Sequence, residues 1–152
     1  MSASARDLAD VIARAREVAA ASTSGVVVAT VACEPPRSLE RLVEPAGDAG
    51  SAFAWHPPAA VRVSGHGEAA RIDAAGPHRF AEVRARAEDL FARVVEVRGE
   101  RCDDAPAPRL FGGAAFRAEA SRAVPWTDFA DASFALPRAR VAVDGGRAWV
   151  SI

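Results

Sequence analysis

The sequence predicts an α+β domain in which a mostly antiparallel sheet is combined with two main helices. Two stretches carry apolar residues at helical spacing, while the other apolar segments are short, β-branched and separated by turn residues. Helices and strands do not alternate regularly, so a doubly wound parallel sheet is not expected. The chain has 152 residues, the length of one domain, and residues 1–152 are expected to form a single unit.

The first helix is predicted over residues 4–21, where apolar side chains recur on one face and Ser4 and Asp7 are placed to cap the N-terminus. That face holds Leu8, Val11, Ile12, Ala15, Val18 and Ala19. Residues 26–32 then form a strand that is apolar on both faces, which indicates cover on both sides. Two prolines at 35–36 end this strand, because neither can donate to a ladder.

The middle of the chain predicts one short helical turn, two strands and the second main helix. The turn is expected at 39–43, and the strands at 51–56 and 60–72. The second strand is interrupted by Gly65-His66-Gly67, which favours a bulge. The helix begins after Gly76-Pro77, and its buried stripe is expected to contain Phe80, Val83, Ala87, Leu90, Phe91 and Val94.

The last third predicts an exposed loop, a strand, a helical turn and a β-hairpin. The loop covers 99–108, the strand 109–116 and the turn 126–129. The hairpin joins residues 133–143 to 147–152 through Asp144-Gly145-Gly146, one of the stronger local signals in a sequence.

Composition excludes several kinds of chemistry. All 19 basic residues are Arg, and Lys, Tyr, Asn and Gln do not occur. A Schiff-base or phosphate-loop lysine is therefore impossible in this chain, and Arg does not deprotonate to replace it. The net charge of −1 gives no electrostatic footprint for nucleic acid or an anionic membrane surface.

The cysteines and the N-terminus indicate a cytoplasmic protein. Cys33 and Cys102 are far apart and form no disulfide framework or metal-ligand spacing. No apolar signal segment occurs at the N-terminus, and the longest apolar run is too short to span a bilayer.

No motif assigns a catalytic, cofactor-binding or metal-binding residue. The Gly65-His66-Gly67 segment lacks the third glycine of a dinucleotide loop, and the three histidines (56, 66 and 78) share no regular spacing. A metal pair formed by His56 and His66 would require neighbouring strands, and it is the less favoured alternative. Trp55, Trp126 and Trp149 are expected to be core anchors in preference to a ligand cage.

Three segments nevertheless form a distinctive series. The strand Arg109-Leu110-Phe111-Gly112-Gly113-Ala114-Ala115-Phe116 is followed by Pro125-Trp126-x-x-Phe129 and then by Phe134-Ala135-Leu136-Pro137-Arg138. This order resembles the N-terminal region of chorismate-utilising enzymes, and of isochorismate synthases in particular. Upstream, Phe53-Ala54-Trp55 and the segment 64–69 are similar to two further strands of that region, so the resemblance covers residues 25–152.

The resemblance implies the N-terminal part of a layered α/β sandwich, in an enzyme that isomerises chorismate in menaquinone, siderophore or salicylate pathways. In that family, a C-terminal region binds chorismate and Mg²⁺ and supplies the catalytic lysine and glutamates. None of those motifs occurs here, so the chain by itself is expected to be inactive and to pair with that region. Self-association through an unpaired sheet edge or apolar face is also expected.

Two alternatives remain open at this level. One is a stand-alone binding or interaction domain on the same scaffold, without catalysis. The other is a sibling activity such as anthranilate or salicylate synthesis, although the Leu-rich inhibitor motif of tryptophan-regulated anthranilate synthases is not evident.

Overall fold

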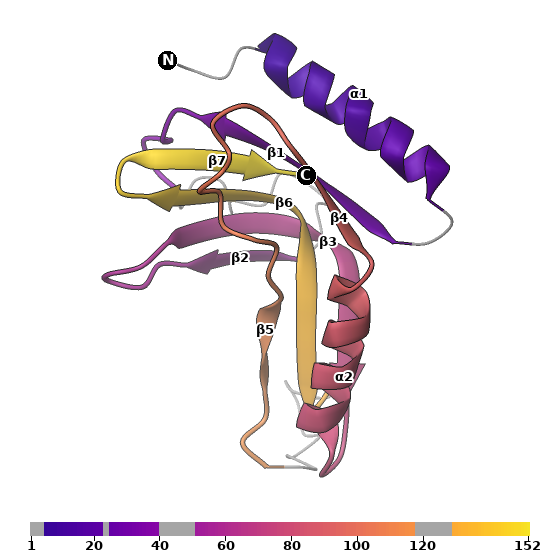
Figure 1. Ribbon diagram of the computed structural model, residues 1–152. Helices are drawn as coiled ribbons and strands as arrows, with labels where there is room; N and C mark the ends of the chain where they lie inside the picture. The colour runs from indigo at the N-terminus through magenta and orange to yellow at the C-terminus, as the bar shows by residue number, and fades with distance from the viewer. Residues whose placement is uncertain (1–4, 23–24, 40–50, 118–128) are drawn as a thin grey trace.

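The computed structural model describes residues 5–22, 25–39, 51–117 and 129–152, and it combines two helices with a seven-stranded, mostly antiparallel sheet (Figure 1). This confirms the predicted α+β class. The helices are α1 (Ala5–Ala21) and α2 (Arg79–Phe91). The strands are β1 (Val26–Cys33), β2 (Ala52–Trp55), β3 (Arg62–Ala74), β4 (Val94–Arg98), β5 (Phe111–Ala114), β6 (Ala132–Asp144) and β7 (Arg147–Ser151).

The strand β6 organises the sheet, whose order is β2-β3-β6-β7-β1-β4 with β5 paired to β6. One edge of β6 pairs along its length with β3. The other edge pairs first with β5, over residues 132–135, and later with β7, over residues 140–144. Residues 136–139 of β6 therefore lie between two partner strands, at the place where the sheet divides.

The hairpin β6–β7 forms as the sequence predicts. Asp144 pairs with Arg147, and the two glycines between them have φ values of +51° and +82°. Positive φ at both central residues gives the turn the twist of the flanking strands, which explains the Gly145-Gly146 pair.

The predicted bulge in β3 is also present. Gly67 has φ of +66°, and the register with β6 shifts between Glu68 and Ala70. The bulge bends β3 together with β6, so the lower halves of these strands turn away from the rest of the sheet (Figure 1).

Helix α1 covers β1 and β4 with its apolar face (Figure 1). Val11 is 4% exposed and packs with Ala29, Val31 and Val97. The residues Val28–Val31 are buried in an unbroken run, so β1 is covered on both faces as predicted. None of the helices among the described residues is long and apolar enough to cross a membrane.

The buried stripe predicted for helix α2 is wrong at both of its ends. Phe80 and Phe91 are 57% and 37% exposed, because α2 packs mainly on β3 and β6 and leaves its flanks to solvent. Val94 does not belong to the helix; it begins β4, which pairs in parallel with β1. Glu82 and Arg86 form an ion pair at 3.4 Å, whereas Arg93 donates to the backbone oxygen of Asp89.

The loop at 99–108 is not wholly exposed, contrary to the prediction. Cys102 and Ala105 are buried in a core cluster with Trp149, Val63 and Ala142. The exposed residues of this loop are 100, 101, 103, 104 and 107. The expected helical turns at 39–43 and 126–129 lie outside the described residues except for their end residues 39 and 129, and Ser4 and Trp126 lie outside them as well.

Candidate functional site

A broad concave surface lies over β2, β5 and the first half of β6. It encloses about 1440 Å³ and carries many aromatic side chains. Trp55, Phe116 and Phe129 are 59%, 106% and 66% exposed. Trp149 is a core anchor as predicted, but Trp55 is not: it lies on this surface. We call this surface the concave face; its aromatic members are Phe53, Trp55, Phe111, Phe116, Phe129 and Phe134.

The concave face depends on two glycines that admit close contacts. Phe53 stacks on Phe111 at 4.2 Å between ring centroids. A Cβ at Gly65 would lie 2.8 Å from the Phe53 ring and 2.6 Å from the Ala139 oxygen, so glycine makes room for the ring. At Gly112 a Cβ would lie 2.0 Å from the backbone oxygen of Ser133 on β6.

The ionisable groups at the concave face are mostly tied to neighbours. Ser51 donates to Glu68 at 2.8 Å, and Arg71 pairs with Asp73 at 2.9 Å. Burial opposes ionisation of Asp73, but hydrogen bonds from Ser133 and Arg71 prevail and hold the pKa of its carboxyl below the usual 3.8. These acids serve ion pairs within the sheet, which is not the arrangement of an acid–base pair facing a substrate.

The histidines and cysteines do not form a reactive cluster. The His56 ring and the Ser64 hydroxyl share a hydrogen bond of 3.0 Å, and His66 is exposed on β3. Within residues 5–22, 25–39, 51–117 and 129–152, no group of three His, Cys, Asp or Glu side chains comes together to hold a metal ion.

The two thiols belong to different packing clusters. Cys102 packs beside Trp149, whereas Cys33 packs with Leu39 and Val143. Burial raises the pKa of both thiols, so each is less nucleophilic than a free cysteine at neutral pH.

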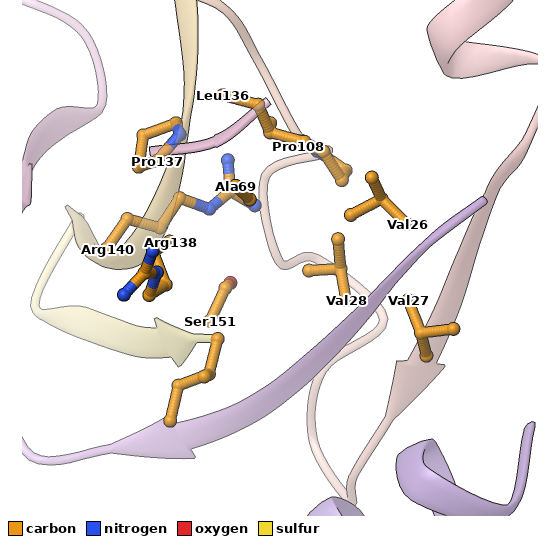
Figure 2. Close-up of a pocket in the computed structure, with 11 residues that line it drawn as sticks. Val26, Val27, Val28, Ala69, Pro108, Leu136, Pro137, Arg138, Arg140 and Ser151 are labelled. Carbon is orange, nitrogen blue, oxygen red and sulfur yellow. The ribbon is translucent and has the colours of Figure 1, made fainter. Parts of the chain in front are cut away.

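A second, smaller cavity of about 180 Å³ opens where β6 leaves β7 (Figure 2). Residues of β1, β3, β6 and the C-terminal end of the chain line it, together with Pro108. The lining consists of Val26, Val27, Val28, Ala69, Pro108, Leu136, Pro137, Arg138, Arg140, Ser151 and Ile152. We call it the β1–β6 cavity.

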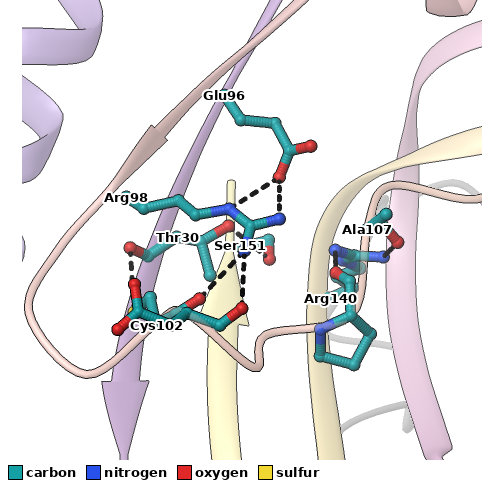
Figure 3. Close-up of polar contacts among 9 residues, drawn as sticks. Thr30, Glu96, Arg98, Cys102, Ala107, Arg140 and Ser151 are labelled. Carbon is teal, nitrogen blue, oxygen red and sulfur yellow. Dashed lines mark hydrogen bonds and ion pairs between the residues drawn. The ribbon is translucent and has the colours of Figure 1, made fainter.

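Arg140 is the unusual member of this lining, because it is only 5% exposed. It donates to the backbone oxygens of Ala107 and Pro106, at 2.8 and 2.5 Å (Figure 3). Burial lowers the pKa of Arg140 to about 10, which leaves the guanidinium charged at neutral pH. Sequence reasoning missed this residue, since an arginine in a strand ordinarily points to solvent.

The polar groups near Arg140 are already paired. The hydroxyls of Thr30 and Ser151 share a hydrogen bond of 2.9 Å across β1 and β7 (Figure 3). Glu96 pairs with Arg98 at 2.8 Å. The first contact joins two inner strands and the second lies on the edge strand β4, and neither supplies a partner to Arg140.

Comparison with known proteins gives one match. Residues 11–152 match a family model described as a chorismate binding enzyme. No curated protein and no solved structure matches the chain.

Proposed function

The chain belongs to the chorismate-binding enzyme family, and we propose that it forms the N-terminal scaffold of an isochorismate synthase-like enzyme. Such an enzyme isomerises chorismate to isochorismate. The observation that carries the proposal is the concave face: β5 and β6, which bear the Gly112-Gly113 and Leu136-Pro137-Arg138 motifs, line an apolar surface without an acid–base pair.

An apolar face of this size is typical of an interface. We propose that the C-terminal chorismate-binding region of the same enzyme packs on it, so that two sheets enclose one layered core. That region would supply the lysine that activates water and the glutamate that protonates the departing hydroxyl. This chain contains no lysine to do so.

The same proposal places Mg²⁺ in the C-terminal region. The described residues do not bring three His, Cys, Asp or Glu side chains together, so they do not offer a set of ligands that fits the ion. The contribution of this chain is to hold the partner region and exclude water from the face between them.

An activity assay with chorismate tests the proposal. The purified 152-residue chain is expected to produce no isochorismate, as measured by liquid chromatography. Co-expression with a C-terminal chorismate-binding region should restore turnover. Clear turnover by the chain alone would overturn the proposal.

Matched variants locate the contact. Trp55→Asp places a charge on the concave face and is expected to reduce the restored activity, because an unpaired charge in an apolar interface is costly. Phe80→Asp changes another exposed aromatic, on α2 outside that face, and should leave the restored activity unchanged. Equal effects of both variants would count against the concave face as the contact.

A stand-alone binding domain is the second candidate, and the β1–β6 cavity with its buried cation favours it. The reading frame beyond Ile152 separates the two. Continuation into a lysine- and glutamate-bearing region supports the enzyme, whereas a stop codon supports the binding domain.

A further inference from the structure

Arg140 is a buried cation that lacks a carboxylate partner among the described residues. Among the described residues, its hydrogen bonds go to two backbone oxygens and use only Nη1 and Nη2. A guanidinium carries five N–H donors, so three N–H groups have no described acceptor. Glu96 is the acid whose charge reaches Arg140, yet Glu96 is held by Arg98.

Two other arginines lie among the charges that act on Arg140, beside Glu96. Arg98 and Arg109 both act to lower its pKa, as burial does first. Arg138, two residues away on β6, also lines the cavity, and it makes no ion pair within the part of the chain that the structure describes (Figure 2). Burying a cation without a counter-charge is costly, so a site of this kind gains stability when an anion enters it.

The rest of the lining is apolar. Val26 and Val28 of β1 face Leu136 of β6 across the β1–β6 cavity, and Pro108 closes one side (Figure 2). A wall of this composition does not hold an inorganic ion well, because most of the ion's hydrogen-bonding capacity would remain unsatisfied. It suits an anion that has an apolar body.

We propose that the β1–β6 cavity binds a small organic anion, namely a monocarboxylate whose apolar body is about one six-membered ring. The volume of about 180 Å³ sets this size. For comparison, an engineered apolar cavity of about 150 Å³ binds benzene. The carboxylate accepts hydrogen bonds from the unused N–H groups of Arg140 and Arg138, and the ring packs on the valines of β1 and on Leu136. The cavity and its cations belong to this chain, so the proposal does not depend on a C-terminal region.

Calorimetric titration of the 152-residue chain with benzoate tests the proposal. Benzyl alcohol has the same ring without the charge, and acetate has the charge without the ring. Benzoate is expected to bind at least about tenfold more tightly than either, because charge-assisted hydrogen bonds and ring burial each contribute on that scale. Equal affinity for all three probes, or no binding of benzoate, would overturn the proposal.

Substitutions at the two cations identify the site. Arg138→Met and Arg140→Met should each weaken benzoate binding by about tenfold or more, since each removes a charged donor. Arg62→Met is the matched control: it removes an exposed arginine of β3 outside the lining and should leave the affinity unchanged.

A spectroscopic readout covers the case in which Arg140→Met does not fold. Benzoate should shift the amide resonances of Val27, Leu136 and Ser151 in the unsubstituted chain. Shifts confined to the concave face, or spread over the surface, would place the ligand elsewhere and overturn the assignment.

Discussion

At the scale of single residues, the two glycines of β5 are chemically identical but stand in different surroundings. Gly112 faces the backbone of β6, where a Cβ would lie 2.0 Å from the Ser133 oxygen and 2.7 Å from the Phe134 Cα. Gly113 has nothing within 4 Å of the same position. The close approach at Gly112 therefore comes from the chain's own neighbouring strand.

This difference gives a matched pair of variants. Gly112→Ala should destabilise the fold by about 1–3 kcal/mol, because backbone atoms must move to relieve the clash. Gly113→Ala should change stability by less than about 0.5 kcal/mol, as is usual at an open surface position. Urea unfolding followed by circular dichroism measures both. Equal losses would show that β5 and β6 do not pack in this register.

At the scale of elements, the sequence pattern predicted those structures that depend on residues close together in the chain. The apolar face of α1, the hairpin turn and the bulge at Gly67 each depend on residues that are near neighbours in the sequence. All three are present. The strand β4 was missed because Val94 also fits the helical spacing of α2. Its role as a strand is decided by β1, its parallel partner some 65 residues earlier in the chain, which periodicity does not report.

The same limit applies to the candidate site. The aromatic residues Trp55 and Phe111 were visible as apolar residues, but a shared concave face arises only when β2 and β5 meet across β3 and β6. Arg140 gave no signal at all, since its burial depends on the backbone oxygens at 106–107, more than 30 residues away. Tertiary pairing, and not composition, creates both surfaces.

The strand β4 can be tested at two positions on the face that α1 partly covers. Val97 is 6% exposed under α1, whereas Val95 is 40% exposed on the same edge strand. Val97→Asp should destabilise the fold by about 3 kcal/mol or more, because it buries an unpaired charge. Val95→Asp should cost less than about 1 kcal/mol, since a charge is tolerated on an exposed edge strand. Thermal unfolding compares them, and a reversed order would mean that α1 covers the position of Val95 and not that of Val97.

At the scale of the whole molecule, the apolar surface is distributed unevenly. One side of the sheet is covered by α1, and the lower strands are covered by α2. The concave face instead presents Trp55, Phe116 and Phe129 to solvent. A surface of this kind drives association when its partner is absent, because burying aromatic side chains removes a large apolar area from water.

The isolated chain is therefore expected to self-associate through the concave face. Sedimentation equilibrium should reveal a concentration-dependent dimer or larger species. The double substitution Trp55→Ser and Phe116→Ser should weaken association by about tenfold or more, since aromatic anchors dominate interface energies. Phe80→Ser, on α2 outside the concave face, is the control and should leave association unchanged. A strict monomer at high concentration would contradict this expectation, and equal weakening by the control would place the contact on another surface.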